Sequence, residues 1–175
     1  MSMPTFNIVE KPAAPENFKV VVGPLRSIKA IVLHIMDGSL SGTDSWFANK
    51  KADVSSHYGI GHKGEIHRYV ADQNIAYHAG EVVEPSWTLI SQYGMDPNLY
   101  TIGIEHEGKA SDTTFPAVQL EASAALVAAL CAKYSIPLDS LHVIGHHEIK
   151  ASKLCPSALP KSQIIAQALQ YGQVT

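Results

Sequence analysis

The sequence predicts a single-domain α/β fold in which a central mixed β-sheet is flanked by helices on both faces. Three observations predict it. Strand-like and helix-like segments are interleaved along the 175 residues, as in folds that pack helices on a sheet. The run Ala30–Ile35 is apolar at nearly every position, the pattern of a strand buried on both faces. Hydrophobic residues make up 46% of the chain, which is enough for one core.

The chain is expected to begin with an extended lead-in, residues 1–27, packed on the main domain of residues 28–175. Four prolines discourage regular structure in the lead-in: Pro4, Pro12, Pro15 and Pro24. The buried strand at residues 30–35 follows. After a polar, turn-like segment, Thr43 or Asp44 predicts the N-cap of a short helix over residues 45–52.

Residues 54–70 predict two short strands joined by a turn at His62, Lys63 and Gly64. The same stretch contains Gly59-x-Gly61-x-x-Gly64, which matches the glycine pattern of dinucleotide-binding loops. That pattern requires a helix after the last glycine, whereas EIHRYV, with its aromatic and β-branched residues, favours a strand. The glycines are therefore interpreted as part of a turn.

The rest of the chain predicts three strands and two helices. The strands are expected at residues 75–80, 99–108 and 141–146, and the helices at residues 116–136 and 162–172. The longer helix shows apolar residues at helical spacing, and Pro137 ends it. Residues 81–98 form an irregular stretch with a helical turn over residues 87–93. A loop this long in a compact domain is usually functional, so Trp87 and Tyr93 are expected to line a substrate groove.

Composition excludes several classes of protein. The 13 basic and 16 acidic residues form no basic stripe, so no nucleic-acid partner is expected. No stretch approaches the roughly 18 apolar residues of a membrane span, and the N-terminus lacks the apolar region of a signal peptide. Two cysteines make no disulfide framework. The protein is expected to be a monomer.

Polar residues at the ends of predicted strands are the candidates for chemistry. His34, Glu105 and His146 each end a strand, and Cys155 follows nine residues after His146. Zinc favours two imidazoles and a thiolate in a tetrahedral site, where three protein ligands leave the fourth position for water. The sheet would have to assemble such a site, because His34 and His146 are far apart in the sequence. Capped strand ends and a packed loop are the alternative, and His147 is a rival to His146.

The chain resembles the zinc-dependent N-acetylmuramoyl-L-alanine amidases of the amidase-2 type, which share their fold with peptidoglycan recognition proteins. The matching stretches occur in family order: AIVLHIM, SSHYGIGHKGEIHRYV, IAYHAG, TIGIEHEG, and VIGHHEI followed by KLCP. The resemblance implies one Zn²⁺ held by His34, His146 and Cys155. A cysteine as the third ligand, where other members have aspartate, makes the chain more similar to phage endolysins.

The resemblance also implies the reaction, hydrolysis of the amide between N-acetylmuramic acid and L-alanine in peptidoglycan. It assigns to Glu105 the transfer of a proton from the attacking water to the leaving amine. It assigns to Lys153 the stabilisation of the oxyanion of the tetrahedral intermediate. His78 matches a position that often faces the substrate. Some members place a catalytic tyrosine where this chain has Ser56, and Tyr58 lies two residues on, so no tyrosine role is carried over.

Two alternatives stay open on the same fold. One is a non-catalytic module that binds peptidoglycan, although such modules typically lack the cysteine ligand. The other is a cytosolic amidase that recycles soluble muropeptides. The expected location is the cytoplasm of the host until release, followed by action on the cell wall.

Overall fold

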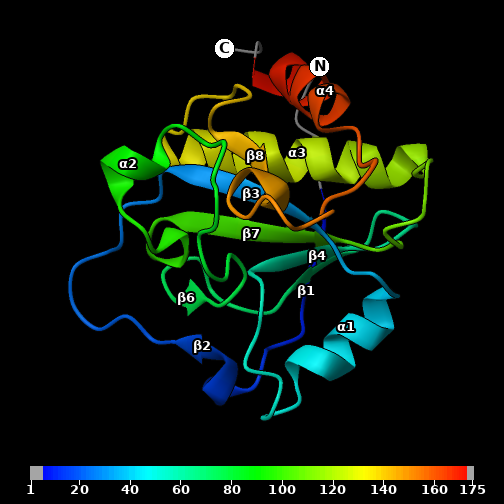
Figure 1. Ribbon diagram of the computed structural model, residues 1–175. Helices are drawn as coiled ribbons and strands as arrows, with labels where there is room; N and C mark the ends of the chain where they lie inside the picture. Colours follow the sequence, from blue (N-terminus) through cyan, green and yellow to red (C-terminus); the bar gives the residue numbers. More distant parts are fainter. Residues whose placement is uncertain (1–5, 173–175) are drawn as a thin grey trace.

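The computed structural model describes residues 6–172. At its centre lies a six-stranded sheet with strand order β1-β5-β4-β7-β3-β8 (Figure 1). The strands are β1 (Ile8–Glu10), β3 (Ala30–Ile35), β4 (Tyr58–Ile60), β5 (Ile66–Arg68), β7 (Thr101–His106) and β8 (Val143–Gly145). Strand β3 is buried at all six positions, as its apolar sequence predicts. The sheet is mixed, because β4 and β5 are antiparallel while β4, β7, β3 and β8 run parallel.

The register of the parallel strands brings the candidate site residues together at the C-terminal ends of neighbouring strands. His34 on β3 pairs with Glu105 on β7, and Leu33 pairs with Gly145 at the end of β8. Paired residues on adjacent parallel strands point to the same face of a sheet. His34, Glu105 and His146, which follows Gly145, therefore emerge together where β3, β7 and β8 end.

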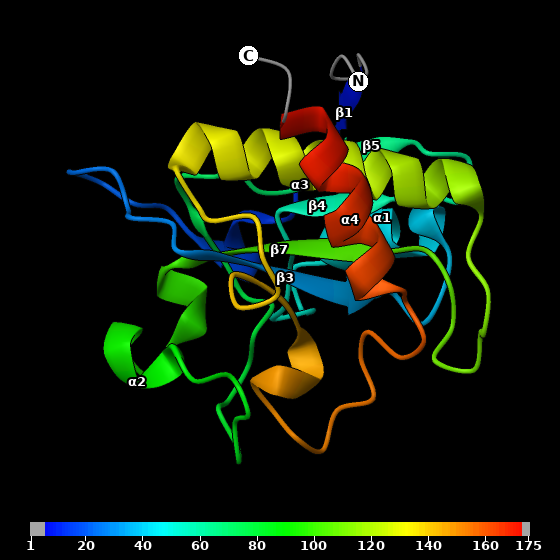
Figure 2. The same cartoon turned by 90° about the horizontal axis from the view of Figure 1, so that it is seen from above.

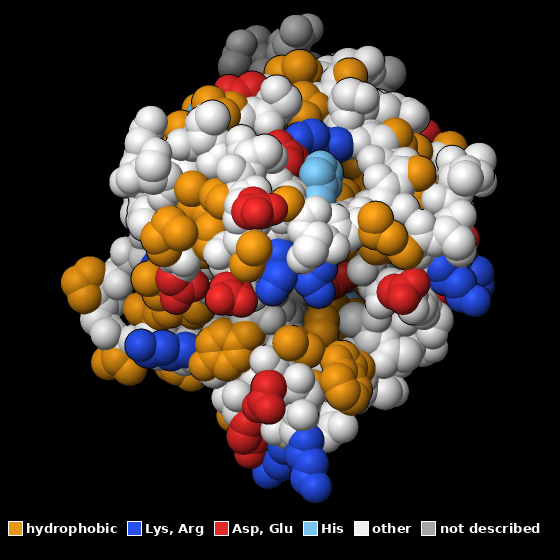
Figure 3. Space-filling model, viewed as in Figure 1, with side chains coloured by type: hydrophobic (Ala, Val, Ile, Leu, Met, Phe, Trp, Pro, Cys, Tyr) orange, Lys and Arg blue, Asp and Glu red, His pale blue; other side chains and the backbone are white. Residues whose placement is uncertain are grey.

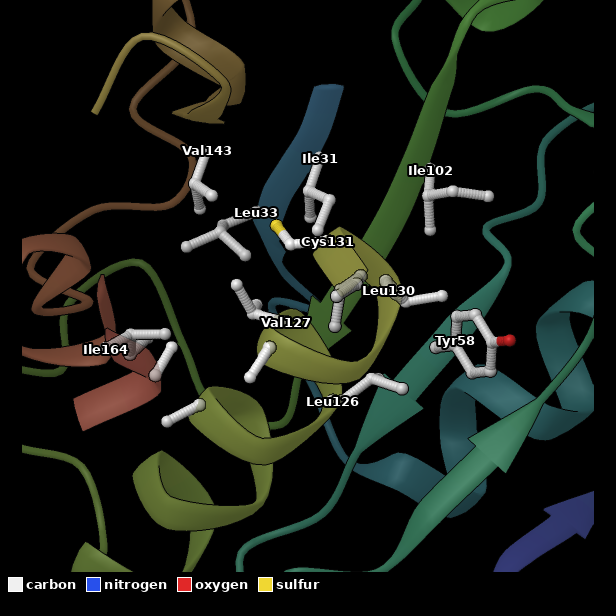
Figure 4. Packing of buried hydrophobic residues seen from close by; sticks show 14 of the residues in the cluster. Ile31, Leu33, Tyr58, Ile102, Leu126, Val127, Leu130, Cys131, Val143 and Ile164 are labelled. Atoms are coloured by element: carbon white, nitrogen blue, oxygen red, sulfur yellow. The ribbon is translucent and has the colours of Figure 1, made fainter. Parts of the chain in front are cut away.

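The long helices cover one face of this sheet. Helix α3 (Ala117–Tyr134) lies across the strands and packs against α4 (Lys161–Gly172). Their apolar side chains meet those of the sheet in the main core, where Ile31 and Leu33 of β3 face Val127 and Cys131 of α3 (Figure 4). Burial of this apolar surface is the main force that holds the layers together.

The opposite face carries shorter elements. Helix α2 (Ile90–Tyr93) and the 3-10 turn η3 (His146–Glu148) lie on the side of the sheet away from α3 (Figure 2). A second cluster of buried residues, which includes Trp87, Tyr100 and Ile144, fills the space between them and the sheet. The prediction of helices on both faces is thus confirmed, with one thick and one thin layer.

Helix α3 has the length and composition of a membrane-spanning helix, although the sequence analysis expected no such stretch. More than half of its apolar window is buried against the sheet and α4. The core helix of an α/β domain has these same properties, so its composition follows from packing on two sides.

The lead-in contains two short strands where its prolines predicted none. Strand β1 joins the sheet edge parallel to β5, and β2 (Phe18–Lys19) pairs antiparallel with β6 (Ile75–Ala76) in a separate two-stranded sheet. Pro12 and Pro15 lie between these two strands and interrupt neither ladder. Arg26 ends the lead-in and donates hydrogen bonds to the backbone carbonyls of Asp72, Asn98 and Thr101.

Helix α1 (Leu40–Phe47) begins and ends about five residues earlier than the sequence predicted. Ser39 is its N-cap and accepts a hydrogen bond from Gly42 N, in place of Thr43 or Asp44. The Asp44 carboxylate instead accepts hydrogen bonds from His67 and the Tyr69 hydroxyl, which tie α1 to β5 and the segment after it. The 3-10 turn η2 (Pro97–Leu99) and η1 (Pro15–Asn17) complete the fold.

Candidate metal centre

His34, His146 and Cys155 come together at the strand ends. One ligand atom from each lies within 4.8 Å of the other two, and Cys155 Sγ is 3.7 Å from His34 Nδ1. The backbone N–H of Ile35 donates to the same sulfur at 3.2 Å. His34 comes from β3, His146 from the turn after β8, and Cys155 from the loop between η3 and α4. Residues 121 positions apart in sequence thus form one compact group.

Hydrogen bonds fix the ring orientation of His34 and point to its tautomer. Thr101 donates its hydroxyl proton to Pro97 O at 2.7 Å, so its oxygen is left to accept from His78 Nε2 at 3.2 Å. His78 Nδ1 is then an acceptor for His34 Nε2–H at 3.0 Å. The chain of donors leaves His34 Nδ1 unprotonated, with its lone pair toward Cys155. This is the form of histidine that binds a metal ion.

His146 is oriented in the same way by a backbone group. Its Nε2 lies 2.9 Å from Ala79 O, so Nε2 carries the proton and Nδ1 is free. Burial lowers the pKa of His146, and it lowers the pKa of His34 further, so both rings are neutral near pH 7. The turn is anchored by Glu148, which accepts from Gly145 N and forms an ion pair with Lys161.

Cys155 is a thiol that a cation would convert to a thiolate. Burial raises its pKa to about 12, and the neighbouring Glu105 carboxylate acts in the same direction. A bound metal ion deprotonates a thiol outright. The separation of 3.7 Å between Cys155 Sγ and His34 Nδ1 is close to the roughly 3.5 Å that tetrahedral zinc bonds of about 2.3 and 2.0 Å imply. The group thus fits a metal ion.

Glu105 places an unpaired carboxylate beside these three residues. Its Oε2 is enclosed and has no hydrogen-bond partner among the described residues. Burial raises the pKa of Glu105 to about 8. A carboxyl group with a pKa near neutrality can take up and release a proton, which is the property of a general base or acid.

A cavity of about 460 Å³ opens over this group, and Lys153 lies at its rim. Lys153 is exposed, and its positive charge disfavours protonation of His34 and His146, which lowers their pKa values. His34, Glu105, His146 and Cys155 all line the same cavity. The structure therefore brings the three proposed ligands and both proposed helpers to one place.

Of the three expected substrate contacts, His78 lines the cavity, whereas Trp87 and Tyr93 do not. His78 reaches the cavity wall, but its ring is buried behind His34 and both of its nitrogens are engaged. A Cβ on Gly103 would lie only 2.6 Å from His78 Cγ, so this glycine makes room for the ring. His78 thus lines the cavity with little exposed surface and holds the ring of His34, and a contact with the substrate stays a prediction.

Trp87 and Tyr93 lie away from the cavity, which corrects the expectation that they form a groove. Trp87 is 2% exposed because its large apolar ring fills the second core cluster. Its indole N–H donates to Leu141 O. Tyr93 packs on the same cluster beside Tyr100 and lines a different pocket.

The rival histidines are also placed. His147 is exposed and its ring lies beside the backbone oxygen of Cys155, outside the ligand group. His106 is fully buried on the α3 side, where Nδ1 bonds His34 O and Nε2 bonds Ser123. It lies on the opposite strand face from Glu105 and therefore does not share the site.

Sequence reasoning missed three side chains that line the site. Trp46 is 51% exposed on α1 and faces the cavity, as does the exposed Leu154. Lys150 lies on the turn after His146 and lines an adjoining hollow. A tryptophan on a short helix directly after the first ligand strand was a signal for Trp46, but only the exposure of its ring distinguishes it from a core residue.

The chain is similar to several known proteins. The family model described as N-acetylmuramoyl-L-alanine amidase matches residues 24–158. N-acetylmuramoyl-L-alanine amidase A of Achromobacter lyticus is 34% identical over 127 residues, and the match covers 71% of this chain and 62% of that relative's length. The chain therefore spans less than two thirds of the curated relative.

Solved structures share the fold. A mutant endolysin from Bacillus subtilis matches with a TM-score of 0.69 and 22% identity, over 94% of this chain and 99% of that one. The amidase AmiD from E. coli, in complex with the substrate anhydro-N-acetylmuramic acid-L-Ala-D-γ-Glu-L-Lys, matches with a TM-score of 0.67 and 24% identity, over 85% of this chain and 60% of that one.

Proposed function

This chain belongs to the N-acetylmuramoyl-L-alanine amidase family, and we propose that it hydrolyses the amide between the lactyl group of N-acetylmuramic acid and L-alanine in peptidoglycan. One observation carries the proposal: His34, His146 and Cys155 surround one point, and the unpaired Glu105 carboxylate shares their cavity. That arrangement supplies a metal site and a proton carrier within reach of one bound amide.

The proposed cofactor is one Zn²⁺, with His34 Nδ1, His146 Nδ1 and Cys155 Sγ as its ligands. Two neutral imidazoles and a sulfur suit zinc better than magnesium or calcium, which prefer oxygen ligands. When bound, zinc supplies an acidified water and polarises a carbonyl oxygen. His34, His146 and Cys155 all line the cavity, so a zinc ion held by them would be within reach of a bound amide.

Glu105 handles the proton in this proposal. Its raised pKa suits removal of a proton from the attacking water and return of that proton to the leaving amine of L-alanine. Because Oε2 has no partner among the described residues, the carboxylate is free to make the hydrogen bond that the water offers.

Lys153 is proposed to stabilise the negative oxygen that develops as the amide carbon becomes tetrahedral. A fixed positive charge is most effective in a site that excludes water, and Lys153 borders the cavity that holds the ligands. Its backbone N–H bonds Lys150 O, which orders the loop that carries it.

The test is the appearance of free L-alanine N-termini from purified peptidoglycan. The zinc-loaded protein should release them, a chelator should stop the release, and added Zn²⁺ should restore it. Glu105→Gln should keep its zinc and lose turnover, by about a hundredfold or more. Release that continues after complete removal of zinc would contradict the mechanism, and so would a lack of release by the loaded protein.

A second candidate substrate is a small soluble muropeptide, because AmiD, which shares the fold, was solved with an anhydro-muropeptide. Intact cell walls and anhydro-N-acetylmuramic acid-L-Ala-D-γ-Glu-L-Lys, offered separately, distinguish the two. A larger kcat/KM on the wall supports an endolysin-like role, and a larger value on the small substrate supports recycling. The extent of the catalytic domain (residues 28–175), the monomeric state and the cytoplasmic location before release stay predictions.

A further inference from the structure

The metal site lies where two surface hollows of different chemistry meet. The hollow described above extends from the ligands toward α1, and its outer wall is apolar. Trp46, Val54 and Leu154 form this wall and are 51%, 39% and 77% exposed. Three exposed apolar side chains around one cavity are more than scattered surface residues and point to a ligand with an apolar face.

We call the other hollow the charged hollow, because four of the residues that line it carry charged side chains. It has a volume of about 330 Å³, and the charged side chains Asp53, Glu81, Lys150 and Lys153 line it together with Asn98. Both hollows are bordered by the same five residues and therefore form one groove, with the ligand His146 at their junction: Val54, Tyr77, His78, His146 and Lys153. On the face of the molecule shown in Figure 3, hydrophobic side chains lie next to lysine or arginine side chains.

The substrate has the same division. The scissile amide joins an uncharged half, the acetylated sugar with its lactyl group, to a peptide half that carries charges. In a stem such as L-Ala-D-γ-Glu-L-Lys, the second residue is linked through its γ-carboxyl group and keeps a free α-carboxylate, while the third carries an ammonium group.

We propose that the groove binds its substrate in one direction, with the sugar in the hollow of Trp46 and the stem peptide in the charged hollow, where Lys150 pairs with the α-carboxylate of the second stem residue. The proposal rests on the proposed amidase function and specifies which half of the substrate lies on each side of the metal site.

The position of Lys150 matches that carboxylate. Lys150 N bonds His146 O at 3.1 Å, so the two residues stand one helical turn apart, where Cβ atoms are about 5–6 Å from each other. The α-carboxylate of the second stem residue lies two residues from the scissile bond, at about 7 Å in an extended chain.

The charge of Lys150 is available to a ligand. Its side chain is 26% exposed, and its only ion pair among the described residues is a loose contact of 3.7 Å to Glu81, which is itself 79% exposed. Such an exposed pair contributes little and yields readily to a better partner. Asp53 and Glu81, which line the same hollow, suit the ammonium group of a basic third residue.

Trp46 suits the sugar because an aromatic ring offers a flat apolar surface to the C–H face of a pyranose. It lies on α1, which Ser39 caps and which Asp44 ties to His67 and Tyr69. The ring is thus carried by a fixed element, and ligand binding requires little ordering.

The peptide half is tested by calorimetry with L-Ala-D-γ-Glu-L-Lys and with the same peptide in which the α-carboxylate is an amide. Wild-type protein should bind the carboxylate peptide about tenfold more tightly. Lys150→Gln should bind both peptides equally, and Lys63→Gln, on the distant hairpin turn, should behave as wild type. Equal affinity of wild type for the two peptides, or no detectable binding of either, would overturn the assignment. A Lys150→Gln variant that loses the same affinity for both peptides relative to wild type would also overturn it.

The sugar half is tested by fluorescence, because the chain has only two tryptophans and Trp87 is buried. N-acetylmuramic acid should change the emission of wild type and leave that of Trp46→Phe unchanged. Trp46→Ala should raise KM about tenfold for N-acetylmuramoyl-L-Ala-D-γ-Glu-L-Lys, and should not change it for the lactyl peptide that lacks the sugar. A loss on both substrates, or on the lactyl peptide alone, would overturn the direction.

These results are separable from the amidase proposal. The calorimetry and the fluorescence titration are made without turnover, so they stand or fall independently of hydrolysis, whereas the comparison of KM values depends on it. If the zinc-loaded protein cleaves neither substrate while both binding differences appear, the proposed function fails and the direction of binding holds.

Discussion

Burial raises the pKa of the Cys155 thiol to about 12, so this residue gains a charge at neutral pH only when a cation binds. Cys155→Ser should therefore lose zinc affinity and activity together, because a hydroxyl is a far poorer ligand. Zinc content after dialysis measures the effect. Cys131→Ala is the matched control, since Cys131 is buried between α3 and the sheet and should leave zinc content unchanged.

His78 is expected to act through His34. His78→Ala removes the acceptor for His34 Nε2–H, so the ring loses its fixed tautomer, and zinc affinity should fall by about 10- to 100-fold. Competition with a chromogenic chelator measures this. His147→Ala should keep its zinc affinity, because His147 lies outside the ligand group. A His78→Ala variant with wild-type affinity would show that the bond does not position the ligand.

Glu105 links pH to the stability of the metal-free protein. Its pKa is raised from 4.5 to about 8, so the folded state holds the proton more tightly than the unfolded state does. Its contribution to stability is full below about pH 4.5 and is lost as the pH rises through about 8. Glu105→Gln should thus gain stability over wild type at pH 8.5, by on the order of a few kcal/mol, and match it near pH 4. Urea unfolding of both metal-free proteins at the two pH values measures this, and a constant difference would contradict it.

At this scale the sequence predicted the ligands better than their surroundings. Strand ends and one loop made His34, His146 and Cys155 candidates, and the resemblance to the amidase family then selected them. Trp87 was misplaced because a tryptophan in a long loop can either fill a core or line a groove, and only its neighbours decide. The role of His78 depends on a hydrogen bond across 44 positions, which has no local signal in the sequence.

The loop that carries Cys155 is held to the segment after β7 by one side chain. Ser157 has a φ of 57°, a left-handed conformation that favours glycine, and its Oγ donates to Ala110 O. Ser157→Ala loses this hydrogen bond and keeps the unfavourable backbone, so it should lower the free energy of unfolding by about 1 kcal/mol. Ser157→Gly loses the same bond but relieves the backbone, and should be nearly neutral. Denaturant unfolding measures both, and equal losses would show that backbone strain has no part.

Elements with strong patterns were predicted closely. The buried strand β3, the hairpin of β4 and β5, and helix α3 lie within a few residues of their expected places. The start of helix α1 was predicted too late in the sequence because Ser39, Thr43 and Asp44 are all good N-caps. The contacts of Asp44 with His67 and Tyr69 decide between them. Strands β1 and β2 were missed because they are short and depend on partners elsewhere in the chain.

On the scale of the whole molecule, a bound metal ion joins β3, the turn after β8 and the loop before α4. Zinc at a hundred times its dissociation constant should stabilise the fold by about 2.7 kcal/mol, which raises Tm by roughly 5–10 °C in a domain of this size. Thermal unfolding with zinc and with a chelator measures the difference. Cys155→Ser should show a much smaller shift, and an equal shift in that variant would indicate binding elsewhere.

The hydrogen bonds of Arg26 make the lead-in part of the functional domain. Arg26 belongs to the lead-in, yet it bonds the carbonyls of Asn98 and Thr101, in the turn that supports His78 and, through it, His34. A shortened version that starts at residue 28 would keep every ligand and every core strand but would release that support from behind. For anyone who trims or fuses this domain, the safe boundary therefore lies before the lead-in.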